Sequence, residues 1–218
     1  MKKLLLVMIV LGMVIFASSC AEEAAAGTSS DEAGSPQAAD VFAALPGGAI
    51  SLRTEGVTVV IPPVSGWHWF SRDLQAQAEE FEEWIRDPAG FVDAMIGEEI
   101  RLVGMQESSG LLVYMFASPE HRYLGLISDT AQLDERQLGA LVRSEQMFYP
   151  SMKVSSGSFG NHVYIVSEEQ DQESQTFYYE IYRPSALVTF KVVIKEEDRL
   201  AGTSISDFEK VLEEISFQ

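Results

Sequence analysis

Histidine and serine side chains carry much hydrolytic chemistry, and their spacing in this chain matches no catalytic motif. The histidines are His68, His121 and His162, and none stands four residues from another or within an H-E-x-x-H run, the spacing that places two zinc ligands on one helix face. No serine lies in a G-x-S-x-G elbow or in an S-x-x-K run with its partner motifs. We therefore predict a protein without catalytic residues, metal or cofactor.

Other polar segments favour structural interpretations. The carboxylates of 168–173 lack the glycine and the distant bidentate glutamate of a calcium loop, so they predict a solvated hairpin tip. The run 157–160, GSFG, predicts a turn before a strand, since no helix follows that could present a phosphate cradle. His162 alternates with Tyr164 on one face of that strand, which favours a structural histidine.

Aromatic residues are the best candidates for a binding surface. Tyr178 and Tyr182 point to one side of a strand predicted at 175–183, and Trp67 and Trp69 share a face if their segment is extended. Tyrosine buries area with little loss of entropy and keeps a polar tip, which suits interfaces. Two interpretations stay open: the tyrosines pack under a covering helix, or they line an open groove beside Trp67 that binds a partner.

The elements that position these residues follow from the apolar patterns. Strands are predicted at 50–52, 57–61, 100–106, 111–117, 122–127, 161–168, 175–183 and 186–194, and helices at 74–86, 88–97, after 134 and from 206. The strand 111–117 is apolar on both faces, so both must be covered. Short connections favour antiparallel pairing. The predicted fold class is α+β, a central antiparallel sheet with helices on both faces.

Three helix starts carry capping signals. Asp87 stands before Pro88, which is an N-cap followed by a proline in the first turn. Asp134 precedes the next helical pattern in the same way. Ser206 and Glu209 have the spacing of a capping box at the start of the final amphipathic helix.

The composition narrows the class of protein and its partners. The chain has 218 residues, 46% of them hydrophobic, with 33 acidic and 15 basic side chains and a formal net charge of −18. This is a globular composition. Phosphate binding needs a footprint of lysine and arginine, so we predict no nucleic-acid partner. A single cysteine excludes an intrachain disulfide framework and a cysteine-rich zinc site.

The N-terminus has the pattern of an export signal. A basic start, MKK, precedes the uncharged stretch 4–17, which is shorter than the ~20 residues of a membrane span and fits the apolar region of a signal peptide. The run 17–20, ASSC, ends in the sole cysteine. It resembles the signal of bacterial lipoproteins, although Ala17 stands where that family usually has leucine.

The resemblance implies that residues 1–19 are a signal peptide and that Cys20 is acylated with fatty acids such as palmitate. Several acyl chains on one residue hold a protein stably on a membrane. Two alternatives are an ordinary signal peptide cleaved elsewhere, which leaves a free thiol, and an uncleaved anchor helix. The acidic segment after Cys20 has too few apolar residues to fold. We therefore predict a disordered tether over 20–44 and a single domain over 45–218.

The order of elements in 45–218 resembles the PsbP-like fold. The similarity rests on two opening strands, the segment 62–67 with its Pro-Pro-x-x-Gly-Trp pattern, strand pairs split by a mid-chain helix, and a final amphipathic helix ending at 215–217. The resemblance implies a three-layer α/β/α sandwich around an antiparallel sheet. It also implies a small extracytoplasmic accessory or scaffolding module, and it transfers no catalytic residues.

Together these patterns favour a non-enzymatic lipoprotein of the bacterial cell envelope, anchored outside the cytoplasm and working with an envelope protein partner. The patterns do not distinguish the inner from the outer membrane. One alternative is a hydrolase-like enzyme whose site is assembled from distant residues, in which His121 or His162 meets a carboxylate and a hydroxyl in a deep pocket. Another is a sensor of small ligands or cations.

Overall fold

The computed structural model describes residues 40–119, 129–160 and 162–218. Its centre is a seven-stranded sheet, the large sheet, in which neighbouring strands pair antiparallel. In spatial order its strands are β4 (Trp67–Ser71), β5 (Leu102–Gln106), β6 (Leu112–Ser118), β10 (Leu187–Lys195), β9 (Ser174–Tyr182), β8 (His162–Gln170) and β7 (Lys153–Phe159).

A second antiparallel sheet, the small sheet, joins segments from both ends of the described chain. Its strands are β1 (Val41–Ala44), β2 (Ile50–Thr54), β3 (Val57–Ile61) and β11 (Ser216–Phe217), in that spatial order. A short 3-10 turn, Pro46–Gly48, links β1 to β2. The hairpin between β2 and β3 turns at Glu55 and Gly56, and both residues have positive φ, which the two central positions of a type I′ turn require.

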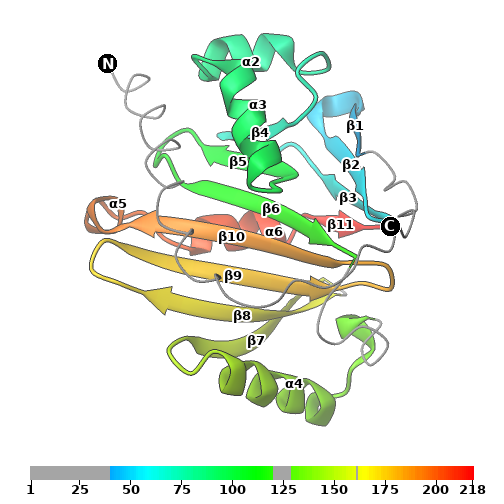
Figure 1. The fold of residues 1–218 in the computed structure, drawn as a ribbon, viewed down its shortest axis with the longest axis vertical. Helices are drawn as coiled ribbons and strands as arrows, with labels where there is room; N and C mark the ends of the chain where they lie inside the picture. Colours follow the sequence, from blue (N-terminus) through cyan, green and yellow to red (C-terminus); the bar gives the residue numbers. More distant parts are fainter. Residues whose placement is uncertain (1–39, 120–128, 161) are drawn as a thin grey trace, which may run out of the picture.

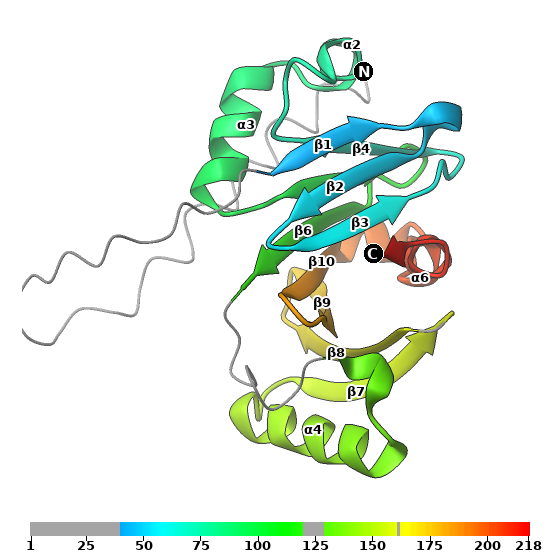
Figure 2. The same cartoon turned by 90° about the vertical axis from the view of Figure 1, so that its right-hand side faces the viewer.

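Helices lie on both faces of the large sheet. α2 (Ala78–Trp84) and α3 (Pro88–Gly97) pack on β4, β5 and β6, and α4 (Glu135–Phe148) covers the same face near β7 (Figure 1). α6 (Ser206–Leu212) lies on the opposite face with the small sheet (Figure 2), and the short α5 (Glu196–Leu200) follows β10. The predicted α+β class with an antiparallel sheet and helices on both faces is confirmed. The small sheet is an additional element of one outer layer.

The main core lies between the large sheet, the small sheet and α6. Phe208 of α6 is fully buried, and its ring centroid lies 5.5 Å from that of Tyr179, 5.7 Å from Phe190 and 6.4 Å from Trp67. These rings come from β9, β10, β4 and α6, so one cluster joins the middle of the sheet to its edge strand and to the covering helix. Burying one such side chain contributes ~1.5–3 kcal/mol.

The folded chain begins earlier than predicted. A tether extending to residue 44 is wrong for residues 41–44, because these form β1 and pair with β2 from Val41↔Arg53 to Ala44↔Ile50. Phe42 packs against the main core. Four residues after an acidic, alanine-rich segment are too short a pattern to identify as a strand without knowing its partner.

The turn predicted at 157–160 is only partly correct. Gly157 lies inside β7 and pairs with Tyr164, and the chain reverses at Gly160, which has a φ of 50°. The ring of Tyr164 lies over Gly157, where a Cβ would collide with it. A glycine inside a strand often marks such a close approach rather than a turn, so β7 went unrecognised.

Two of the three predicted helix caps are confirmed. The side chains of Asp87 and Asp134 each accept a hydrogen bond from the backbone N–H three residues later. The capping box of Ser206 and Glu209 is wrong, because no side-chain hydrogen bond caps α6. Glu209 instead accepts a hydrogen bond from the hydroxyl of Tyr179 at 3.0 Å. A contact with the sheet has thus replaced the local one that the spacing suggested.

The signal peptide, Cys20, His121 and the strand predicted at 122–127 lie outside the described residues. Within the three ranges that the structure describes, every helix is too short or too polar to cross a membrane.

Candidate functional site

The two tryptophans predicted for a binding surface lie in the main core. Trp67 and Trp69 alternate along β4, and their stacked ring centroids are 5.8 Å apart. Each residue is only 9% exposed. The ring of Trp69 lies over Gly104 of β5, where an added Cβ would come within 2.6 Å of it. Both tryptophans are therefore packing residues in this structure.

The two tyrosines lie on the other face of the large sheet. The register of the strands shows this. Trp69 lies opposite Gly104, and Gly104 lies opposite Val113, on the face that points to the main core. Tyr178 lies opposite Lys191, on the other face. The Nζ of Lys191 lies 5.6 Å above the ring of Tyr178.

Tyr182 is fully buried in the cluster under α4, beside Leu141. Its hydroxyl is 3.4 Å from a carboxylate oxygen of Glu145. Packing under a helix, one of the two interpretations that the sequence left open, describes Tyr182. The four aromatic residues do not form one surface, since the sheet separates Trp67 and Trp69 from Tyr178 and Tyr182.

His162 lies beside a cation rather than in a catalytic pair. The Nη1 of Arg183 is 3.4 Å from Nδ1 of His162 and 3.3 Å from Oδ2 of Asp129; we call these three residues the arginine–histidine cluster. Burial lowers the pKa of His162, and Arg183 lowers it further, while Asp129 opposes both effects. The group nearest to Nδ1 of His162 in the cluster is thus a guanidinium, which has no lone pair with which to accept a proton. The ring centroid of His68 of β4 lies 4.1 Å from that of Trp84, with the two planes tilted by 34°.

The acidic tip at 168–173 forms a turn. Oδ1 of Asp171 accepts hydrogen bonds from the backbone N–H groups of Glu173 and Ser174, both at 2.7 Å. These bonds lower the pKa of Asp171. Over the described residues, no three histidine, cysteine or acidic side chains are grouped so that they could hold a metal ion.

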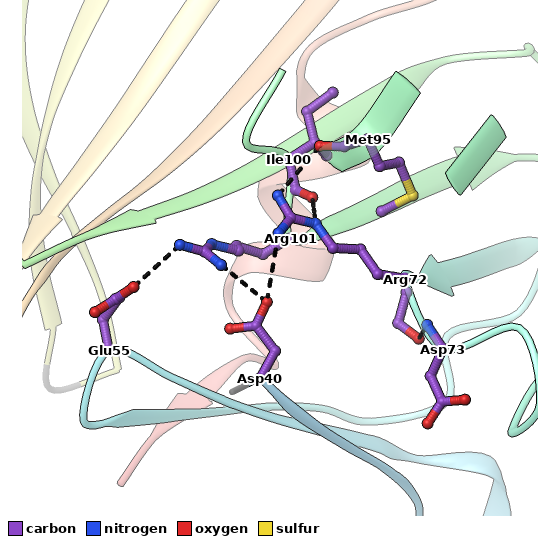
Figure 3. A network of polar contacts seen from close by, with 8 residues as sticks. Asp40, Glu55, Arg72, Asp73, Met95, Ile100 and Arg101 are labelled. Atoms are coloured by element: carbon purple, nitrogen blue, oxygen red, sulfur yellow. Dashed lines mark hydrogen bonds and ion pairs between the residues drawn. The ribbon is translucent and has the colours of Figure 1, made fainter. Parts of the chain in front are cut away.

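A polar hollow lies where the small sheet meets the β4 end of the large sheet, and Figure 3 shows the polar contacts beside it. Arg72 directly follows β4 and Arg101 directly precedes β5, and the pairing of Ser71 with Leu102 brings the two arginines side by side. Asp40, the residue before β1, reaches both of them. We call Asp40, Glu55, Arg72, Arg101 and the adjoining cavity the arginine pocket.

Arg72 is oriented by the backbone around α3. Its Nε donates to the carbonyl of Ile100 at 2.6 Å and its Nη2 to the carbonyl of Met95 at 3.1 Å. Nη1 remains directed to Asp40, 3.8 Å from Oδ2. Burial lowers the pKa of Arg72, as does Arg101, while Asp40 and Glu99 raise it. An arginine stays protonated even so, and two cations are therefore held close together.

Arg101 is held by two carboxylates. Its Nη1 donates to Oδ2 of Asp40 and its Nη2 to Oε1 of Glu55, both at 3.0 Å. Glu55 adopts a φ of 47° in the hairpin turn, a conformation that is uncommon for residues other than glycine. The turn thus places a mostly buried carboxylate against Arg101.

The cavity beside these groups has a volume of about 390 Å³, in the range of small-ligand sites. Its walls combine charged, polar and apolar side chains from the small sheet and the residue before it, from the end of β4 and the segment that follows, and from the residue before β5. They are Asp40, Phe42, Leu52, Ser71, Arg72, Asp73, Leu74, Gln75 and Arg101.

The chemistry of this arrangement is anion binding. Guanidinium groups donate directed hydrogen bonds to carboxylates. Here the two guanidinium groups face one carboxylate oxygen, Oδ2 of Asp40, which Arg101 hydrogen-bonds at 3.0 Å and Arg72 approaches to 3.8 Å. Because arginine does not release its proton near neutral pH, such a pair is suited to orient an anion and not to transfer protons.

The sequence analysis missed this site, although a signal was present. In an acidic chain with 15 basic residues, Arg72 ends one apolar strand and Arg101 begins another. Antiparallel pairing of those two strands places the arginines together. Asp40 and Glu55 could not be assigned to them, because both come from the small sheet, whose contact with β4 and β5 is a tertiary feature.

Comparisons with known proteins found one similar structure. No family model matches the chain, and no curated protein matches it. Among solved structures, the chain is similar to cyanobacterial PsbP (CyanoP) from Synechocystis sp. PCC 6803, with 11% sequence identity, a TM-score of 0.36, and coverage of 75% of this chain and 88% of that chain. The order of elements in the sequence resembles the same PsbP-like fold.

Proposed function

We propose that this protein is a lipoprotein of the bacterial cell envelope whose domain is a non-enzymatic binding module held outside the cytoplasm. The observation that carries the binding role is the arginine pocket. It joins a cavity of about 390 Å³ to two cations whose positions are set by backbone carbonyls and by Glu55. Such preorganised polar groups in a partly apolar cavity are typical of a binding site.

The anchoring is proposed from the N-terminal pattern. A basic start, the uncharged stretch 4–17 and small residues lead to Cys20, and these three features together match an acylated N-terminus. Asp40 stands twenty residues after Cys20, and a flexible segment of that length spans ~25 Å on average. The pocket then lies at the point where the tether enters the domain.

Labelled fatty acid tests the anchor. We expect the label to enter the wild-type chain in cells, and not Cys20→Ser, because the thiol is the acylation site. The wild-type domain should be digested by protease added to cells whose outer envelope has been opened, while a cytoplasmic marker stays intact. Absence of label from the wild-type chain, or protection of the domain from protease, would overturn the proposed location.

Position-specific crosslinking tests the binding role. A photo-crosslinking residue at Gln75, which is exposed at the rim of the pocket, should give an adduct in intact cells. The matched control is the same residue at Lys153 of β7, at the far end of the large sheet. Identical products from both positions, or none from position 75, would contradict a binding module that works through this end of the domain.

A further inference from the structure

We propose that the arginine pocket binds a small organic acid, a monocarboxylate with a short apolar group, and that Asp40 is an internal carboxylate that competes with it. The inference deepens the proposed binding role and does not depend on the lipid anchor. It rests on three features: the direction of the arginine donors, the composition of the cavity walls, and the position of Asp40 in the chain.

The donors converge on a single place. Arg72 donates hydrogen bonds from Nε and Nη2 to backbone carbonyls, and Arg101 donates one from Nη2 to Glu55. The Nη1 of each arginine points to Oδ2 of Asp40, at 3.8 Å and 3.0 Å. A ligand carboxylate in the place of the Asp40 carboxylate would meet two donors whose orientation is set by other contacts, which reduces the entropy lost on binding.

Charge favours a single carboxylate over a more highly charged anion. Replacing one carboxylate by another leaves the local charge unchanged, so no counterion is required. Glu55 stays paired with Arg101, and Asp73 lines the same cavity. A second negative group on the ligand would therefore lie close to carboxylates of the protein, which is unfavourable in a site of reduced dielectric.

The walls indicate the rest of the ligand. Phe42, Leu52 and Leu74 contribute apolar surface beside the guanidinium groups. An aliphatic or small aromatic group attached to the carboxylate would bury surface against them, at ~25 cal/mol per Å². The cavity volume of about 390 Å³ suits a small molecule.

The position of Asp40 makes its carboxylate replaceable. Asp40 directly precedes β1, a four-residue strand at the edge of the small sheet that pairs with β2 alone. Val41 is 57% exposed. Short edge segments with little buried surface open at a lower free energy than the core does, so a ligand can displace Asp40 without disturbing the large sheet.

The test uses the full-length chain as it is purified from cells and titrates it with hexanoate, hexanamide and succinate by calorimetry. We expect hexanoate to bind, and hexanamide and succinate to bind at least tenfold more weakly.

Asp40→Asn should lower the Kd for hexanoate about tenfold, as it would if Asp40 left the site in about one molecule in ten. Arg101→Gln should raise the Kd at least tenfold. The matched control is Arg199→Gln, an exposed arginine on α5 paired with Glu196, which should leave the Kd unchanged.

Several outcomes would overturn the proposal. They are equal binding of hexanoate and hexanamide, an equal effect of Arg199→Gln and Arg101→Gln, or no binding to either wild type or Asp40→Asn. The Asp40→Asn variant keeps both arginines, so the proposal stays falsifiable even if Arg101→Gln fails to fold. If no acid binds while crosslinking at Gln75 still captures a partner, the pocket inference fails and the proposed binding module stands.

Discussion

The arginine–histidine cluster and the arginine pocket both pair partly buried arginines with carboxylates, but they differ in their surroundings. In the arginine–histidine cluster, Arg183 meets one carboxylate, Asp129, and one neutral partner, His162, and its guanidinium lies 5.8 Å from the ring centroid of Phe217. In the arginine pocket, two guanidinium groups approach one oxygen of Asp40 beside a cavity. Arg183, packed on the ring of Phe217, stabilises the fold. Arg72 and Arg101, placed around the carboxylate of Asp40, form a site at which one anion can replace another.

The largest expected effect is a loss of stability on changing the main core. Phe208→Ala removes a fully buried ring that contacts β4, β9 and β10, and should lower the free energy of unfolding by about 3–5 kcal/mol. Urea denaturation followed by tryptophan fluorescence measures the loss. A loss under about 1 kcal/mol would contradict a core organised around this residue, with the exposed Leu200→Ala as a control that should change little.

A smaller loss of stability should distinguish the arginine pocket from the arginine–histidine cluster. Arg101→Gln removes two ion pairs, each at 3.0 Å, and leaves Glu55 without this cation while Asp40 keeps Arg72 at 3.8 Å. It should therefore lower the free energy of unfolding by about 2 kcal/mol. Arg183→Gln removes one ion pair at 3.3 Å and should lower it by about 1 kcal/mol. Both side chains are equally buried, 16% exposed, so the difference measures the number of carboxylates. Equal losses in denaturant titrations would remove this distinction.

The smallest effect is a pH dependence at the arginine–histidine cluster. The pKa of His162 is lowered from 6.5 in the folded protein. Just below pH 6.5, the unfolded chain therefore binds a proton at this histidine to a greater extent than the folded chain does. The unfolding free energy should therefore fall as the pH drops from about 6.5 to the lowered pKa, and His162→Gln should abolish that part of the slope.

The cause of this shift can be checked in the same cluster. Arg183→Gln removes the repulsion that lowers the pKa of His162, so its NMR titration midpoint should rise. A midpoint that stays in place would show that burial alone sets the shift.

The sequence predicted the large sheet better than the small one, for a physical reason. β6 is a continuous apolar run and β10 is apolar along most of its nine residues, and such patterns can be recognised without knowing what the strand packs against. β1 and β11 have four and two residues, so they are strands only because β2 and β3 provide hydrogen-bonding edges. The helix caps show the same limit. The cap by Asp134 is a local hydrogen bond and was predictable, whereas Glu209 accepts a hydrogen bond from Tyr179 of the sheet instead of capping its helix.

The candidate site was less accessible to sequence analysis than the fold. The aromatic residues chosen for their interface chemistry, Trp67, Trp69 and Tyr182, are buried in two separate cores. Aromatic side chains are common both at interfaces and in cores, so residue type alone could not separate the two. The arginine pocket depends on register between β4 and β5 and on contacts from the small sheet, neither of which a single sequence reveals.

The pairing of β3 with β11 ties together parts of the chain that are far apart in sequence. Val59 is opposite Phe217, and the backbone of Thr58 exchanges two hydrogen bonds of 2.9 Å with Gln218. A chain that emerges N-terminus first cannot make this contact until residues 216–218 have emerged, and by then every strand of the large sheet has already emerged. Loss of those residues would leave β3 with an open row of hydrogen-bonding groups, an edge that could recruit a strand from a second molecule.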